Sequence, residues 1–163
     1  MEPTPGNTRM RLSDHLSEST VFLSAGPHRD AILPLLVDGI CRHWHEGDPA
    51  VFLERTWARE KQGATSVGLG VSIPHLRCES LSDLRIAVAV HSPGTDFPSP
   101  DGLPVRLVFL LASPPAKAGS HVRALAAVAR LDPGTVEALV GSSDAGAFLA
   151  TLRAWEDRPG ARG

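Results

Sequence analysis

The segment that most constrains the fold is 105–112, which reads VRLVFLLA and contains almost no polar residue. A strand with one face in water alternates apolar and polar residues, whereas a strand that is apolar throughout is buried on both faces. Residues 85–91 (RIAVAVH) form a second run of this kind. Two such strands need helices on both sides of their sheet. The sequence therefore predicts an α/β sandwich with a small central mixed β-sheet flanked by helices.

Helical periodicity supplies the covering layers. Apolar residues recur at spacings of three and four in several windows that are bounded by turn or capping residues. Ser120 has the position and chemistry of an N-cap. The face of that helix predicted to point inward carries Val122, Leu125, Val128 and Ala129. In all, we expect helices over roughly residues 29–46, 50–62, 120–131, 134–140 and 144–155.

A single domain accounts for the length of the chain. The 163 residues, 42% of them apolar, lie within the usual range for one domain with its own core. Both ends are polar and rich in proline and glycine. We expect a flexible N-terminal tail over 1–11, a single domain over 12–156 and a flexible C-terminal tail over 157–163.

Charge and hydropathy argue against several classes of function. The net charge is −2, and lysine and arginine do not cluster, so nucleic acid is not an expected partner. No apolar run approaches about 18 residues, so direct membrane insertion is not expected. The N-terminus lacks the apolar core of a signal peptide. Cys41 and Cys78 make no disulfide framework, which favours a reducing compartment. We therefore expect a cytoplasmic protein.

Residues 59–75, reading REKQGATSVGLGVSIPH, are the first candidate for chemistry. Gly68 and Gly70 would allow the backbone to approach an anion closely, with Thr65 and Ser66 lining the same loop. His75 ends the run, and an imidazole there can act as a nucleophile toward phosphorus. The run matches neither a Walker loop nor a dinucleotide fingerprint. A strand-end histidine held by backbone hydrogen bonds is the structural alternative.

His121 and Arg59 are the second and third candidates. With Ser120 as N-cap, His121 falls in the first turn of a helix, where the dipole favours a nearby anion and disfavours imidazolium. Arg59 could hold a phosphate through paired hydrogen bonds. A surface histidine and a solvated helix arginine are the corresponding structural interpretations.

A cluster of possible metal ligands occurs in the first helix. Cys41, His43 and His45 have C-x-H-x-H spacing. Only Cys41 and His45 share a helix face, and no complete H-E-x-x-H pattern is present. We expect no metal site here, although a metal-dependent hydrolase remains a distant alternative.

Taken together, these motifs resemble type-2 IIA proteins of the phosphoenolpyruvate-dependent sugar phosphotransferase system, in the fructose, mannitol and nitrogen-regulatory branch. The similarity extends over about residues 12–155. The segments that carry it are Arg59-Glu60, Gly63-Ala64-Thr65, 68–75 (GLGVSIPH), 101–105 (DGLPV), 107–111 and 120–125 (SHVRAL).

The resemblance implies a phosphocarrier. His75 would accept a phosphoryl group from the carrier protein HPr or its nitrogen-branch relative, and pass it to a cysteine of a IIB domain or hold it as a regulatory state. His121 would match the assisting histidine and Arg59 the stabilising arginine, with no cofactor. Leu76 stands where relatives often have glycine, which would alter the docking surface. The alternative is a non-catalytic IIA-like regulatory binding module.

Overall fold

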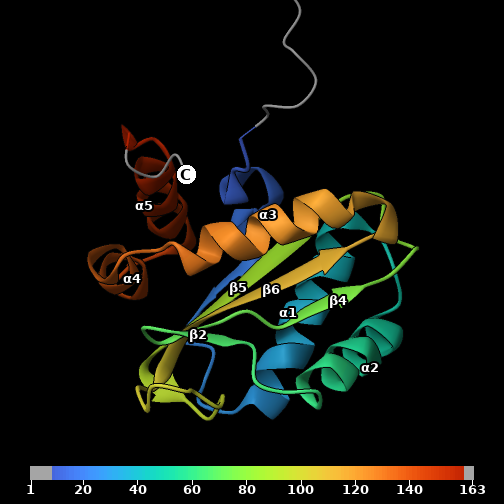
Figure 1. The fold of residues 1–163 in the computed structure, drawn as a ribbon, viewed down its shortest axis with the longest axis horizontal. Helices are drawn as coiled ribbons and strands as arrows, with labels where there is room; N and C mark the ends of the chain where they lie inside the picture. The colour runs from blue at the N-terminus through green and yellow to red at the C-terminus, as the bar shows by residue number, and fades with distance from the viewer. Residues whose placement is uncertain (1–8, 160–163) are drawn as a thin grey trace, which may run out of the picture.

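The two strands expected to be buried form the centre of the sheet. The computed structural model describes residues 9–159, and in it β5 (Arg85–Thr95) and β6 (Val105–Ser113) pair antiparallel (Figure 1). The strand order is β1-β5-β6-β3-β2, and β4 also pairs with β6. β1 runs parallel to β5, β3 and β4 run parallel to β6, and β2 is antiparallel to β3. The predicted mixed sheet is therefore confirmed. The four remaining strands are β1 (Val21–Leu23), β2 (Ser66–Gly68), β3 (Val71–Ser72) and β4 (His75–Arg77).

β3 and β4 occupy the same edge of β6 but are separate strands. Val71 lies opposite Leu107, and His75 lies opposite Leu111 further along β6. Ile73 and Pro74 between them belong to neither strand, since proline has no N–H to donate to a ladder. His75 is thus the first residue of a new short strand.

In the part of the chain that the structure describes, five α-helices cover the sheet, as predicted. None of the helices in residues 9–159 has the length and hydrophobicity needed to span a bilayer. The helices are α1 (Arg29–Trp44), α2 (Pro49–Glu60), α3 (Ala118–Ala129), α4 (Pro133–Val140) and α5 (Ala145–Glu156), with short 3₁₀ helices η1 (Leu12–His15), η2 (Glu18–Thr20) and η3 (Pro115–Lys117).

The core consists of two layers, one on each face of the sheet. Alternate residues of a strand point to opposite faces, and β6 supplies both layers. Leu107, Phe109 and Leu111 pack with α3, α4 and α5. Val108 and Leu110 pack with α1 and α2. Burial on both faces explains why β6 has so few polar residues.

The start and the inward face of α3 differ from the prediction. The helix begins at Ala118, so Ser120 lies inside it and is not the N-cap. The N-cap residue is Lys117, which makes no side-chain capping bond. Val122 is 59% exposed and Ala129 is also exposed, whereas His121 is 1% exposed. One residue corresponds to about 100° of helix rotation. A prediction based on hydrophobicity therefore chose Val122, whereas its neighbour His121 occupies the inward position. Val128 is buried and Leu125 packs partly buried against the core, as predicted.

The described ends of the domain contact each other. Arg11 donates to Asp157 at 2.7 Å, and the buried Ser13 hydroxyl donates to Glu156 at 2.5 Å. Residues 1–8 and 160–163 of the two predicted tails lie outside the described residues. The domain limits at 12 and 156 stay a prediction.

Candidate functional site

His75 and His121 are brought together by β4 and α3. β4 lies against β6, and α3 packs over the same strand. The two imidazole rings meet edge to face, with their centroids 5.2 Å apart and their planes at 71°. The two histidines that the sequence singled out independently therefore form one site.

The hydrogen bond of His75 determines its tautomer. Its Nδ1 lies 2.9 Å from the carbonyl oxygen of Ile73. A carbonyl can only accept, so Nδ1 carries the proton and Nε2 keeps its lone pair. Burial lowers the pKa of the half-buried His75 below its ordinary value, and the Ile73 carbonyl opposes that shift. The charges of Arg59 and Arg77 add to the lowering. His75 therefore presents a neutral ring with Nε2 available for reaction.

His121 is almost fully enclosed and neutral. Its Nδ1 lies 2.6 Å from the hydroxyl oxygen of Ser113, the last residue of β6. Burial lowers the pKa of His121 to about 4, and two smaller contributions come from the charge that His75 has when protonated and from the charge of Arg77. Imidazole in water has a pKa of about 6.5. At neutral pH His121 can therefore donate or accept a hydrogen bond without carrying charge.

This pKa shift makes stability depend on pH. In the unfolded chain the imidazole of His121 binds a proton near pH 6.5, whereas the native ring stays neutral down to about pH 4. The unfolded state thus holds more protons in this window, so we expect the free energy of unfolding to fall as the pH is lowered through it. Urea denaturation at several pH values measures the slope. His121→Gln should flatten it, while a substitution of the exposed His43 to Gln should not. Equal slopes in wild type and His121→Gln would contradict this assignment.

Two arginines flank the histidines. Arg59, at the end of α2, donates to the carbonyl of Gly63 at 3.3 Å, and its charge acts on His75. Arg77 is exposed and shares a side of β4 with His75, because alternate strand residues face the same way. Leu76 faces the opposite layer and is 3% exposed. Arg77 is therefore the exposed neighbour of His75, and the effect of Leu76 on the docking surface stays a prediction.

Thr65 contacts a buried acid. Its hydroxyl donates to Glu60 Oε1 at 2.6 Å and lies 3.4 Å from the hydroxyl of Ser72. Glu60 is 8% exposed, and its charge raises the pKa of His75. Sequence reasoning assigned no role to Glu60. Its position in the sequence could have indicated that it is buried. Glu60 follows Phe52 and Thr56 at intervals of four, on the buried face of α2.

The other residues of the predicted phosphate loop lie elsewhere. Gly68 and Gly70 form the turn between β2 and β3, both with positive φ. Leu69 N–H donates to the Asp101 carboxylate at 3.0 Å, so an anion already occupies this turn. Ser66 donates to the carbonyl of Pro98 in the β5–β6 loop.

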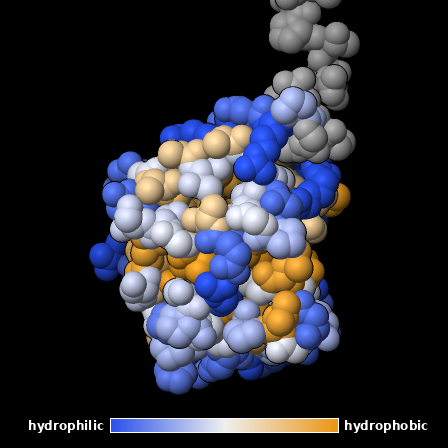
Figure 2. All heavy atoms as spheres, turned by 90° about the vertical axis from the view of Figure 1, so that its left-hand side faces the viewer, coloured by the Kyte–Doolittle hydropathy of each residue, from blue (hydrophilic) through white to orange (hydrophobic). Residues whose placement is uncertain are grey.

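The position of the turn along β6 also places Ser66, Gly68 and Gly70 away from His75. β3 pairs at Leu107 and His75 lies opposite Leu111, so four residues, roughly 13 Å, separate the two levels along β6. Val67 and Leu69 of this hairpin and Leu103 of the β5–β6 loop are large apolar residues that are 44–50% exposed. Figure 2 shows apolar side chains reaching the surface on the side that carries α4 and the β5–β6 loop. Ser66, Gly68 and Gly70 therefore serve the hairpin and do not surround His75.

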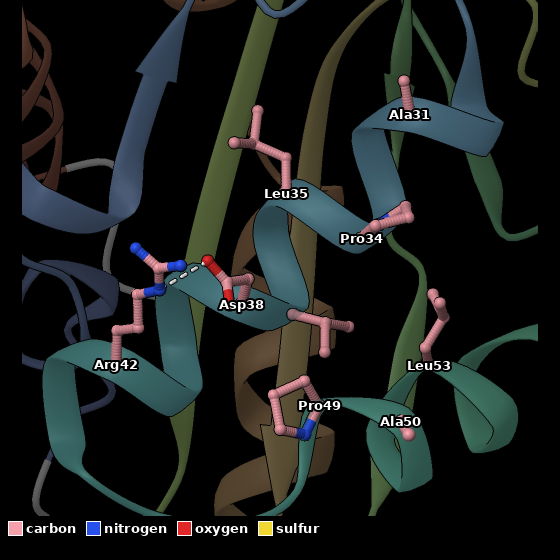
Figure 3. A pocket seen from close by; sticks show the side chains of 9 residues that line it. Ala31, Pro34, Leu35, Asp38, Arg42, Pro49, Ala50 and Leu53 are labelled. Atoms are coloured by element: carbon pink, nitrogen blue, oxygen red, sulfur yellow. Dashed lines mark ion pairs between the residues drawn. The ribbon is translucent and has the colours of Figure 1, made fainter.

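A separate groove lies between α1 and α2. It has a volume of about 520 Å³, and its residues include Leu35, Leu53 and the ion pair of Asp38 with Arg42, 2.8 Å long (Figure 3). None of the candidate site residues lines it.

Cys41 and His43 lie in the last turn of α1, and His45 is its C-cap residue. Cys41 is buried, and burial raises the pKa of its thiol to about 11. Within residues 9–159, no group of three or more histidine, cysteine or acidic side chains is arranged to hold a metal ion.

Known proteins resemble this chain in sequence and in fold. Residues 15–155 match the family described as the phosphoenolpyruvate-dependent sugar phosphotransferase system, EIIA 2. The chain belongs to this family.

Relatives of this IIA domain include regulatory and sugar-transport proteins. It is 41% identical over 109 residues to a nitrogen regulatory protein of Bradyrhizobium diazoefficiens, covering 66% of this chain and 71% of the relative. The crystal structure of nitrogen regulatory protein IIA-Ntr from Neisseria meningitidis has a TM-score of 0.78 at 28% identity, covering 86% of this chain and 98% of that one. The mannitol enzyme IIA of Escherichia coli, solved in complex with phosphorylated enzyme IIB, has a TM-score of 0.70 at 17% identity, covering 85% and 97%. The predicted family and fold are thus confirmed.

Proposed function

We propose that this IIA domain carries a phosphoryl group on Nε2 of His75. The group is taken from the phosphohistidine of an HPr-like carrier and passed to a IIB partner or held as a regulatory state. The observation that carries the proposal is the pairing of the two rings. Nδ1 of His75 is committed to the Ile73 carbonyl, and the remaining nitrogen belongs to a ring that faces the buried, neutral His121.

The transfer needs no cofactor at this site. The lone pair of His75 Nε2 attacks phosphorus, a new N–P bond forms, and the N–P bond of the donor breaks with its electron pair returning to the donor imidazole. His75 keeps its Nδ1 proton, so the phosphorylated ring gains positive charge. The Ile73 carbonyl, already an acceptor for that N–H, stabilises the charged ring.

Positive and neutral donors surround the reacting group. His121 assists by donating a hydrogen bond to a phosphoryl oxygen, and Arg59 supplies a stabilising positive charge. Arg77 lies on the same side of β4 as His75 and adds a second charge. Thr65 acts indirectly, because its hydroxyl holds Glu60 beneath the site.

The relatives support the choice of partners. The mannitol enzyme IIA was solved with phosphorylated IIB, which supports a IIB domain as acceptor. The Bradyrhizobium and Neisseria relatives are nitrogen regulatory proteins, which supports a regulatory use of the phosphorylated state. Both uses place the protein in the cytoplasm, with an HPr-like donor.

Reconstitution tests the proposal. Incubated with phosphoenolpyruvate, enzyme I and an HPr-like protein, this chain should gain about 80 Da, the mass of one phosphoryl group. The modification should be lost in acid and survive in base, and intact-protein mass spectrometry measures both. Absence of the gain with donors from both the sugar and the nitrogen branches would favour the non-catalytic binding module instead.

A further inference from the structure

Ser113 is a polar residue at the end of an apolar stripe. Leu107, Phe109 and Leu111 of β6 face α3, and Ser113 is the next residue on that face. It is 0% exposed. A buried hydroxyl at a position where every preceding residue is apolar breaks the local pattern, and such exceptions gather at functional sites.

We infer that Ser113 is a positioning residue that sets the tautomer of His121. Its hydroxyl donates to Nδ1 of His121, which places the ring proton on Nε2, the nitrogen that can then donate to a phosphoryl oxygen on His75. The use of the Nε2 proton rests on the proposed function, because it requires a phosphoryl group on His75. The tautomer of His121 can be measured in the unphosphorylated protein.

The direction of the hydrogen bond follows from the burial of both groups. The two atoms are 2.6 Å apart, and the ring is 1% exposed. If the ring donated, the serine hydrogen would need another acceptor. Among the described residues, His121 is the hydrogen-bond partner of this hydroxyl. A buried donor without an acceptor costs about 1–3 kcal/mol. With serine as the donor, the bond satisfies the hydroxyl hydrogen and the Nδ1 lone pair of His121. Nε2 of His121 is not among the described buried side-chain atoms that lack a partner, so its N–H is not left as a buried unpaired donor.

The backbone holds Ser113 in place for this contact. The carbonyl of Ser113 accepts the N–H of Cys78 at 3.0 Å, and its partner residue in β4 is Arg77. Ser113 is therefore fixed by the same pair of strands that carries His75. One rigid element thus positions His75 directly and His121 through the serine hydroxyl.

The tautomer matters because His121 remains neutral. Burial holds the pKa of His121 at about 4, so at pH 7 only one of its nitrogens bears a proton. With the proton on Nδ1, the Nε2 lone pair would face an anionic phosphoryl oxygen and repel it. With the proton on Nε2, the same atom donates. The choice of tautomer therefore converts a repulsion into a hydrogen bond.

NMR of the unphosphorylated protein tests the inference. Long-range ¹H–¹⁵N correlation at pH 7 should show His121 protonated at Nε2 in the wild type. Ser113→Ala should shift His121 toward the other tautomer or a mixture, and slow phosphoryl transfer through His75 by about tenfold, the loss of one hydrogen bond. Ser113→Thr, which keeps the hydroxyl, should restore the wild-type tautomer and most of the rate. Ser13→Ala, which removes a buried hydroxyl bonded to Glu156, is the matched control and should leave both unchanged.

The results separate this inference from the proposed function. A wild-type His121 protonated at Nδ1, or a Ser113→Ala tautomer equal to that of the wild type, would overturn the role of Ser113 even if phosphorylation proceeds normally. Failure of the wild type to accept phosphate would overturn the proposed function and leave the tautomer result standing. If Ser113→Ala does not fold, the wild-type spectrum still tests the inference, because protonation of His121 at Nδ1 would overturn it.

Discussion

His75→Ala should abolish phosphoryl acceptance completely. The variant lacks the nucleophile, and His121 cannot replace it, because that ring is 1% exposed and its Nδ1 is bonded to Ser113. Mass spectrometry after incubation with phosphoenolpyruvate, enzyme I and an HPr-like protein should show only the unmodified mass. A phosphorylated His75→Ala protein would mean that the acceptor is another residue.

Two further variants distinguish loss of chemistry from loss of structure. In His75→Asn the side-chain amide takes roughly the place of Nδ1 and can still donate to the Ile73 carbonyl, but no nucleophilic nitrogen remains. This variant should fold like the wild type and accept no phosphate. His43→Ala removes an exposed histidine that contacts Ser19, and it should be phosphorylated at the wild-type rate.

His121→Ala should still accept phosphate but should do so about 10²–10³-fold more slowly, the usual effect of removing one donor to a transition-state oxyanion. The buried ring contributes its effect mainly as charge builds on the phosphoryl oxygens, so the rate should change far more than the final extent of labelling. Rapid-quench measurement of single-turnover transfer separates the two quantities. A wild-type rate would show that His121 has only a structural role.

The two amide replacements of His121 sharpen this test. Glutamine places its amide near Nε2 and can still donate to a phosphoryl oxygen, whereas asparagine places its amide near Nδ1, toward Ser113. His121→Gln should therefore recover part of the rate and His121→Asn should not. The opposite order would assign the useful proton to Nδ1.

The architecture was predictable because hydrophobic patterns determine it. A strand as apolar as β6 requires cover on both faces, and five helices were found from their periodicity. The phase of α3 was not predictable in the same way. His121 stands in the buried stripe of α3, so a prediction based on hydrophobicity chose its neighbour Val122, although it placed Val128 correctly. The error fell on a residue of the candidate site.

The candidate site was predictable in part. His75, His121 and Arg59 stood out because their chemistry suits an anion. The glycines at 68 and 70 were assigned to the wrong place, because sequence proximity to His75 does not show that a hairpin carries them several residues away along β6. Glu60 and Ser113 received no role because each acts through a tertiary contact, with Thr65 and with His121 respectively. Only the fold brings those partners together.

The interruption between β3 and β4 explains why a proline precedes the reactive histidine. Pro74 keeps Ile73 out of both strands, and the Ile73 carbonyl then bonds to the imidazole of His75. Without the interruption, this edge would offer its carbonyls to a ladder, and the ring would be free to rotate and exchange tautomers. A designer who wished to graft such a histidine onto another sheet would therefore have to transfer the break as well as the side chain.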